Sequence, residues 1–420
     1  MTDVEIRPLR PDDDLDAQLD LSERAFGVAP AAERERWKRA AAAHIGQGAF
    51  LGAFADGRPA GAALYHDMRQ WWHGRAMPMA GVAGVKVAPE CRGRGIGRRM
   101  MTELFGQIAE RGYPVSVLWP ATMPIYRSLG WELGGGLYQA TVPARELRSL
   151  LAPDPAVADP AVADPAVAGP GHGDLRAAVN DVVVRRAAPE DAAGVIAVLG
   201  KAHEAGRHNG PLTRDEETVR DWLARDDIYA YLADDGFLAY QWDGDNDDAI
   251  FAERIVAASP VTYRALWSVL ASHSSTAREI RAKLAPEDPL WWLTRERDVR
   301  LARRSMWMLR VVDAPAAIGA RGFPPSVSLS VPLVIADAAR PSNSGRWRLE
   351  VADGKGTLTP DGAGAGRAGL GLGARGLAGL FGGTPVSTLR HAGLVSGGSP
   401  EDDAALSAAF PGPTFILDNF

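Results

Sequence analysis

The sequence of 420 residues predicts an α/β protein with more than one domain. Small and β-branched residues, a glycine-rich turn and a helical pattern follow one another between Gly81 and Ile108, which is typical of a strand, a loop and a helix. The order of elements around this unit begins again after about residue 177, and the pattern changes once more after residue 304. A chain of this length suggests roughly two to four domains.

Residues 1–150 are expected to form the first domain, with strands and helices in alternation. The predicted elements are, in order, a strand at residues 4–9, helices at 15–26 and after Pro30, a hairpin at 50–65 turning at Asp56-Gly57, strands at 77–79 and 82–87, a long helix to Ile108, a buried strand at 115–119 and a short helix at 124–129.

The glycine-rich turn predicts a site for a pyrophosphate. Gly93, Gly95 and Gly97 let the backbone approach a ligand closely, and the helix that follows presents unpaired N–H groups and the positive end of its dipole. Arg92, Arg94, Arg98 and Arg99 add positive charge. The spacing matches neither the dinucleotide fingerprint nor the P-loop. The alternative is a tight turn with solvated arginines.

Two adjoining motifs resemble the GNAT acyltransferases, namely V-x-V-x-P at residues 85–89 and R-x-x-G-x-G at residues 92–97. The resemblance implies that the loop holds the pyrophosphate of acetyl-CoA and that the preceding strand pairs with the pantetheine arm. The cofactor-binding residues predicted in this way are Val85, Lys86, Val87, Arg92, Gly93, Arg94, Gly95, Ile96, Gly97, Arg98, Ala121 and Thr122.

A proline-rich linker and a second copy of the pattern follow. The repeat DPAVA begins at Asp154, Asp159 and Asp164, and proline every five residues predicts an extended linker over residues 151–176. Residues 184–191 echo residues 6–13, so residues 177–303 are expected to form a second GNAT-like domain. The loop after its presumed cofactor strand, VTYRALWSVL, has no glycine, which predicts a degenerate domain that cannot bind CoA in the same way.

Residues 304–420 are expected to form a third domain with mixed strands and helices. Strands are predicted at 306–312, 327–335, 347–351 and 356–359, a helix at 315–322, and a packed helical region at 361–383 that is rich in glycine and alanine.

Composition narrows the possible functions. The net charge of −6 argues against a protein built to grip nucleic acid or an anionic membrane, and it suits a cationic partner. Cys91 is the single cysteine, so no intrachain disulfide is possible. No apolar run approaches the ~20 residues of a membrane span and the N-terminus is polar, so we expect a cytoplasmic protein. The eight histidines show no His-x-x-x-His pair, and we expect no metal.

Two further stretches, residues 288–323 and residues 125–131, resemble the Eis acetyltransferases, a GNAT family. The resemblance covers essentially the whole chain and implies a sterol-carrier-like α+β domain at the C-terminus. It also implies acetylation of amines on aminoglycosides, related polyamines or protein lysines, a hexameric assembly, and a C-terminal carboxylate folded back into the first domain's active site.

The same resemblance suggests the catalytic and substrate-binding residues. Tyr126 would protonate the CoA thiolate; the alternative is a core tyrosine. Phe420 would supply its terminal carboxylate as general base, and because the reference pKa of such a group is only ~3.5, an upward shift or a water relay is required. Phe26 and Trp37 are the predicted aromatic contacts of a cationic amine, with Trp71 and Trp72 as further candidates. Helix packing is the alternative for Trp37.

Two functions of different class are compatible with the sequence. The first is an N-acetyltransferase that uses acetyl-CoA, and the intact loop together with Tyr126 favours it. The second is a non-catalytic regulatory protein that binds CoA or a lipid, which an open apolar cavity in the C-terminal domain would favour.

Overall fold

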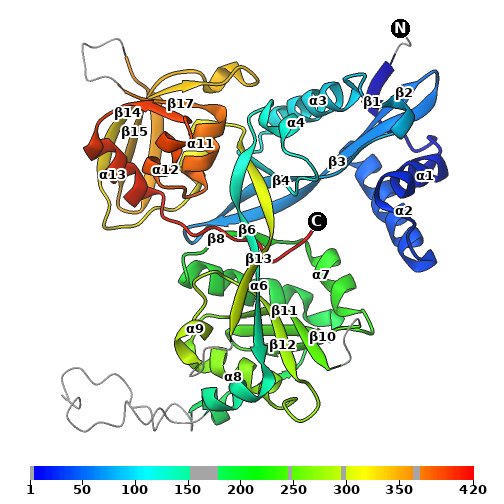
Figure 1. Ribbon diagram of the computed structural model, residues 1–420, viewed down its shortest axis with the longest axis vertical. Coiled ribbons are helices and arrows are strands. Elements are labelled where there is room, and N and C mark those ends of the chain that lie inside the picture. Colours follow the sequence, from blue (N-terminus) through cyan, green and yellow to red (C-terminus); the bar gives the residue numbers. More distant parts are fainter. Residues whose placement is uncertain (1–3, 152–177, 245–247, 295–298, 363–368) are drawn as a thin grey trace.

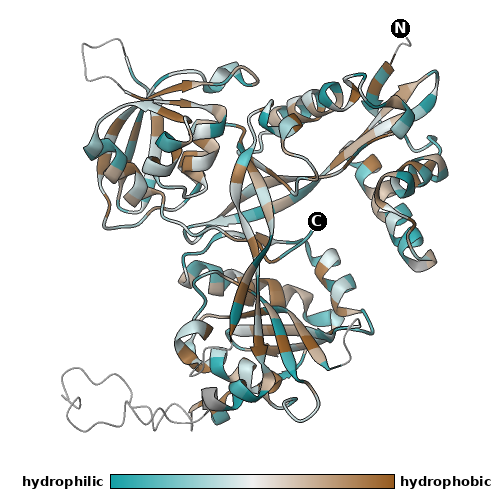
Figure 2. Ribbon diagram, viewed as in Figure 1, coloured by the Kyte–Doolittle hydropathy of each residue, from teal (hydrophilic) through white to brown (hydrophobic). Residues whose placement is uncertain are grey.

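The computed structural model describes residues 4–151, 178–244, 248–294, 299–362 and 369–420. The chain forms three lobes: the first (blue to cyan), the second below it (green) and the C-terminal one at upper left (orange to red) (Figure 1). Figure 2 shows hydrophobic residues concentrated in the central strands of each lobe. The predicted DPAVA linker lies outside the described residues.

The first lobe follows the predicted order of strands and helices. Its elements are β1 (Val4–Pro8), α1 (Leu15–Phe26), α2 (Ala31–Gly46), β2 (Phe50–Ala55), β3 (Arg58–Trp72), β4 (Arg75–Val87), α3 (Ile96–Glu110), β5 (Val115–Leu118), α4 (Pro124–Arg127) and β6 (Glu132–Pro143). Asp14 caps α1, because its side chain accepts hydrogen bonds from the N–H groups of Asp16 and Ala17. Helix α3 buries one face, including Met100, Leu104 and Ile108, against the sheet.

The second lobe repeats this order with one added strand between its first two helices. Its elements are β7 (Arg185–Arg186), α6 (Ala192–Ala205), β8 (Asn209–Thr213), α7 (Glu216–Leu223), β9 (Tyr229–Ala233), β10 (Gly236–Trp242), β11 (Ala249–Ala257), α8 (Pro260–Ala271), β12 (Glu279–Leu284), α9 (Leu290–Leu293) and β13 (Arg300–Val311).

One continuous sheet of 13 strands joins the two lobes. Strand β6 belongs to both, since it pairs with β13 from Glu132 to Thr141 and with β12 over Tyr138–Pro143. Strand β13 in turn lies between β5 and β6. The predicted boundary between residues 303 and 304 therefore falls inside β13. The reason is that this strand completes the sheet of the first lobe instead of opening the third.

The C-terminal lobe is an α+β unit around a sheet of five strands with the order β16-β15-β14-β17-β18. Its elements are α10 (Ala314–Ala320), β14 (Leu329–Ala336), β15 (Gly345–Ala352), β16 (Lys355–Pro360), β17 (Leu370–Gly373), α11 (Ala374–Phe381), α12 (Val386–His391), β18 (Val395–Gly397) and α13 (Pro400–Ala409). The predicted helical region at 361–383 is partly wrong: residues 363–368 lie outside the described residues, and the rest contains β17 as well as α11, because β17 pairs in parallel with β14.

The last residues leave the C-terminal lobe and return to the junction of the other two (Figure 1). Phe415 donates its N–H to the carbonyl of Asn209 at 3.0 Å, and Ile416 donates to the carbonyl of Gly136 at 3.1 Å. The chain therefore ends beside the shared sheet and not on the lobe in which its last helix lies. No helix among the described residues is long and apolar enough to cross a membrane.

Candidate active site

A gap opens in the first lobe where β4 and β5 part. The two strands pair in parallel only from Met79 with Val115 to Val82 with Leu118. Strand β5 ends there, whereas β4 continues to Val87. The backbone groups of residues 83–87 on the β5 side therefore have no hydrogen-bond partner in β5. They can form hydrogen bonds with an extended ligand arm instead.

A β-bulge shapes this part of β4. Ala62 of β3 pairs with Lys86 and Leu64 pairs with Ala83, so β4 carries one extra residue in the interval. Gly84 within it has φ +60°, a conformation that glycine adopts without strain. Sequence reasoning missed the bulge, although a glycine inside a strand pattern is its usual signal.

The glycine-rich loop lies just beyond the end of β4 and forms an open cradle. Gly93 and Gly95 have φ +78° and +74°, and a Cβ added to either would meet nothing within 4 Å. Gly95 is the N-cap of α3 and offers no side-chain cap, so the first N–H groups of the helix stay available. A cavity of about 430 Å³ is lined by this loop together with Val87, Pro124, Ile125 and Ser128.

These features fit a pyrophosphate. The predicted residues Arg92, Arg94 and Arg98 are exposed around the cradle, and the Nε of Arg92 donates to the carbonyl of Val87 at 3.3 Å. Ile96 buries its side chain in the core, so only its backbone N–H faces the loop.

Three of the predicted cofactor-binding residues have side chains that lie away from the cradle: Lys86, Ala121 and Thr122. The Lys86 side chain is 5% exposed, and its Nζ lies 5.6 Å from the centre of the Trp37 ring on the other face of the sheet. Successive side chains of a strand alternate between faces, so Lys86 points away from Val85 and Val87. Ala121 and Thr122 are exposed in the loop between β5 and α4, outside the residues that line the cradle.

Tyr126 lies directly behind the cradle. It is 5% exposed and belongs to the hydrophobic cluster beneath α3, while its neighbours Ile125 and Ser128 line the cavity. Burial raises the pKa of Tyr126 to about 12. The phenol is therefore protonated at neutral pH and is able to donate a proton.

A second cavity, of about 480 Å³, lies between the first two lobes. Its walls come from α2, β3 and the start of α7, and His44, His66 and Met68 line it. Four carboxylates, of Asp67, Asp215, Glu217 and Asp221, outnumber three guanidinium groups, of Arg36, Arg39 and Arg214. The acidic balance suits a ligand with several cationic groups.

The predicted aromatic contacts do not line this cavity. Phe26 is 60% exposed at the end of α1. Trp37 packs edge-on against Phe50, with ring centres 6.4 Å apart, because it shares the buried face of α2 with Ala41 and Ile45, whereas the neighbouring face supplies the cavity wall.

The two further tryptophan candidates also have structural partners. Trp72 is fully buried between Trp307 and Phe381 in the core. Trp71 donates its indole N–H to the hydroxyl of Thr213 at 2.8 Å, which fixes it against β8.

The C-terminus lies next to the second cavity, although Phe420 is not one of its lining residues. The Phe420 ring lies against Gly81 of β4, where an added Cβ would come within 2.9 Å of it, and 6.2 Å from the ring of His66. Arg214 holds the residue before it, since its guanidinium donates to the carbonyl of Asn419 at 2.6 Å. The terminal residue thus lies beside the last paired residues of β4, next to the gap that faces the cradle.

The tail is anchored in the corresponding gap of the second lobe. Strands β11 and β12 pair in parallel only from Ala249 to Ala252. Beyond this point Asp418 forms an ion pair of 2.6 Å with Arg254, which is 6% exposed. Burial alone would raise the pKa of Asp418, but the cations of Arg254 and Arg214 hold it below its usual value.

At the start of α8, the described part of the second lobe has no cradle like that of the first lobe. Ser259 caps α8, its hydroxyl accepting from the N–H of Thr262, and Pro260 at the first position of the helix has no N–H to offer. The N–H groups at the start of α8 are capped by a side chain or absent, so they are less available to a phosphate. This agrees with the lack of glycine in the sequence VTYRALWSVL.

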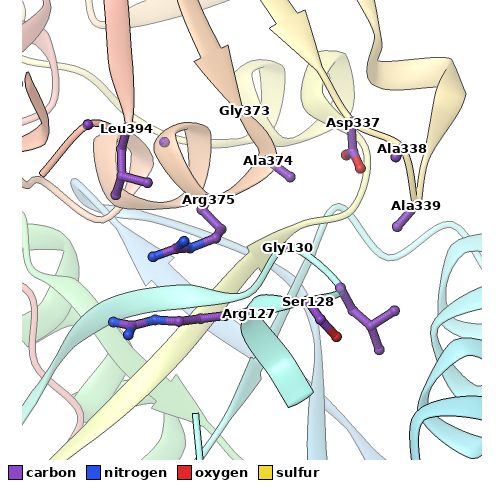
Figure 3. Close-up of a pocket in the computed structure, with 13 residues that line it drawn as sticks. Arg127, Ser128, Gly130, Asp337, Ala338, Ala339, Gly373, Ala374, Arg375 and Leu394 are labelled. Atoms are coloured by element: carbon purple, nitrogen blue, oxygen red, sulfur yellow. The ribbon is translucent and has the colours of Figure 1, made fainter. Parts of the chain in front are cut away.

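A third cavity, of about 280 Å³, separates the first lobe from the C-terminal one (Figure 3). Arg127 and Arg375 extend in the same direction from its opposite walls. Both guanidinium groups pair with the carboxylate of Glu132, the first at 2.7 Å and the second at 2.5 Å. The arginines are therefore part of an ion-pair bridge between lobes.

Within the described part of the chain, no group of three His, Cys, Asp or Glu side chains is placed to hold a metal ion.

Comparison with known proteins agrees with this architecture. Residues 5–134 match an acetyltransferase (GNAT) domain family, residues 210–311 match another, and residues 314–417 match a sterol carrier protein domain. The predicted fold class, two GNAT-like domains followed by a sterol-carrier-like α+β domain, is confirmed.

Similar proteins are acetyltransferases. The N-acetyltransferase Eis of Mycobacterium tuberculosis is 30% identical over 332 residues, which are 75% of this chain and 74% of that protein. A crystal structure of a GCN5-related N-acetyltransferase from Kribbella flavida is 41% identical, with a TM-score of 0.87 over 100% of this chain and 99% of its own. Eis1 from Mycobacterium abscessus, at 24% identity and a TM-score of 0.75 over 99% of this chain and 100% of its own, shares the fold.

Proposed function

The chain belongs to the Eis family of N-acetyltransferases, and from this premise we propose that it transfers the acetyl group of acetyl-CoA to amines of aminoglycosides, related polyamines or lysine side chains. GNAT acetyltransferases use acetyl-CoA. One observation carries the choice of acceptor: the cavity in which four carboxylates outnumber three guanidinium groups is also lined by His66, whose ring centre lies 6.2 Å from that of Phe420.

The proposed reaction removes two protons from the nitrogen, adds one to sulfur and releases one to solvent. An alkyl ammonium loses one proton to solvent, attacks the thioester carbonyl as the neutral amine and loses a second proton as the C–S bond breaks. In this proposal the Phe420 carboxylate accepts the second proton from the nitrogen, the Tyr126 phenol donates one to the departing thiolate, and the proton held by the carboxylate returns to the Tyr126 phenolate through solvent. A backbone N–H of residues 85–87 stabilises the negative oxygen of the thioester carbon.

The first test is release of CoA thiol over a panel of amines. Neomycin, spermidine and a lysine-containing peptide are incubated with the protein and acetyl-CoA, and we expect turnover with at least one of them, with the acetyl group found on nitrogen by mass spectrometry. Because neomycin and spermidine carry several cationic groups, we expect a lower KM for them than for a monoamine of similar size. CoA release at the rate of the amine-free control for every member would contradict the proposed function.

The general base is tested by moving the terminal carboxylate. A variant without Phe420 and one with Gly-Ser appended after it should each lose about 10²-fold or more in turnover, since general base catalysis is worth about 10²–10⁴-fold. Phe420→Leu keeps the carboxylate in place and should lose much less. Acetyl-CoA affinity, measured by calorimetry, should be equal in all of them, because the cradle is untouched. Full turnover by the extended variant at saturating amine would show that the carboxylate has no catalytic part.

The hexameric assembly, the cytoplasmic location and the binding of any lipid by the C-terminal domain stay predictions. The match to acetyltransferase domains and to N-acetyltransferases supports an enzyme over a regulatory protein without turnover.

A further inference from the structure

Two histidines that line the second cavity, the one between the first two lobes, have no part in the chemistry proposed above. His44 on α2 and His66 on β3 meet nearly at right angles, with Nε2 of His44 3.0 Å from Nδ1 of His66. The other nitrogen of His44, Nδ1, lies 2.6 Å from the carbonyl oxygen of Ala40. Both side chains line the cavity.

These contacts fix which nitrogen carries each proton. A carbonyl oxygen only accepts, so Nδ1 of His44 is the protonated nitrogen, and in the neutral ring its Nε2 carries a lone pair. The N–H between the rings must then belong to Nδ1 of His66, which leaves the lone pair of His66 on Nε2. That atom has no hydrogen-bond partner within the described ranges, so it is free to accept one.

His66 is held neutral by its surroundings. Burial is the main reason that the pKa of His66 is lowered to about 3; His44, when it is charged, and Arg214 lower it further, against the opposing effect of Asp215. The remaining charged groups on the cavity wall belong to Arg36, Arg39, Asp67, Glu217 and Asp221. A neutral imidazole does not repel an ammonium group, and while His44 is neutral the Nε2 of His66 is available as an acceptor.

His66 lies close to the place where we propose that the reaction occurs. In the register of β3 and β4 it lies opposite Gly81, the residue on which the Phe420 ring rests. The paired part of β4 and β5 ends one residue later, at Val82. His66 is therefore a lining residue of the cavity that lies opposite β4 one residue before β4 and β5 part.

We propose that His66, oriented by His44, binds the acceptor amine: its Nε2 accepts a hydrogen bond from the nitrogen that is to be acetylated and aligns that nitrogen beside the terminal residue. This rests on the proposed function, because it gives His66 a place in the acceptor site. His44 is a positioning residue that acts through the tautomer of its neighbour.

The test compares three substitutions in the full-length protein with neomycin and spermidine as probes. His66→Leu removes the acceptor and should raise the amine KM about tenfold or more, with kcat and acetyl-CoA affinity changed little, since a hydrogen bond to a charged group is being lost. His66→Gln can still present an oxygen and should recover part of the loss. His44→Leu removes the contact that sets the tautomer of His66, and it should raise the amine KM by an intermediate amount.

His391→Leu is the matched control. Its Nδ1 also lies against the carbonyl four residues earlier on a helix, at 2.7 Å from Ser387, but it lies in the C-terminal lobe. It should leave the amine KM unchanged. An amine KM within twofold of the wild-type value in His66→Leu would overturn the inference, as would equal losses in the Gln and Leu variants.

A binding measurement separates this inference from the proposed function. If the wild-type protein acetylates no amine but binds neomycin in calorimetry, the proposed function fails, and the Kd of the His66 variants decides the inference by the same criteria. If the wild-type protein binds neither neomycin nor spermidine, the inference is wrong.

Discussion

Gly95→Glu is expected to abolish measurable binding of acetyl-CoA while leaving the protein folded. A Cβ at this position points into open space, so no packing is disturbed. The carboxylate would enter the cradle at the start of α3, where it would interact favourably with the helix N-terminus and repel the phosphates from it. Calorimetry with acetyl-CoA measures the loss, and circular dichroism checks the fold.

The backbone at Gly95 needs its own control, because φ is +74° and any side chain there is strained. Gly112 provides it: the residue follows the other end of α3, has φ +76° and has equally open surroundings. Gly112→Glu should show a similar loss of stability with normal acetyl-CoA affinity. Gly95→Gln, which adds the same bulk without charge, should lose less affinity than Gly95→Glu. Unchanged affinity in Gly95→Glu would show that the phosphates bind elsewhere.

Tyr126→Phe is expected to reduce turnover by about 10²–10⁴-fold with little change in the affinity for acetyl-CoA, because a proton donor is removed and the ring is kept. Since burial raises the pKa of Tyr126 to about 12, the donor is intact over the usual assay range, and loss of activity from its ionisation is expected only above about pH 11. Steady-state kinetics over saturating substrate concentrations measure the change.

Tyr65→Phe is the control for the loss of a buried hydroxyl group. Tyr65 is 1% exposed and belongs to the same hydrophobic cluster, and burial raises its pKa as well. It should keep near-normal turnover. If Tyr126→Phe behaves in the same way, Tyr126 is a core tyrosine that supports α4, and the thiolate takes its proton from water.

The cradle was predictable from the sequence because all its parts are close together in the chain. A strand, three glycines and a helix within residues 81–108 specify the geometry locally, and the structure has the same order of elements. The order of elements in the second lobe was also predictable, because its sequence repeats the pattern of strands and helices of the first lobe.

The second cavity, which we propose as the acceptor site, was harder to predict because its walls are brought together by tertiary packing. Local spacing of histidines gives no hint of the contact between His44 and His66, which are 22 residues apart on a helix and a strand. Trp37 shows the same dependence on packing: it is predicted to contact substrate, and in the structure it packs against Phe50 while its neighbour Arg36 lines the cavity. Only the orientation of that helix on the sheet decides which face meets the ligand.

Strand β13 has a consequence for the synthesis of the protein. It lies between β5 and β6, so the sheet of the first lobe contains residues 300–311 as an interior strand. While the ribosome is still making the second lobe, the facing edges of β5 and β6 have no partner and are open to wrong pairing with other nascent chains. The first lobe therefore cannot complete its fold when its own last residue emerges. It must wait until more than 300 residues have been translated, and a fragment that ends after β6 should be prone to aggregate.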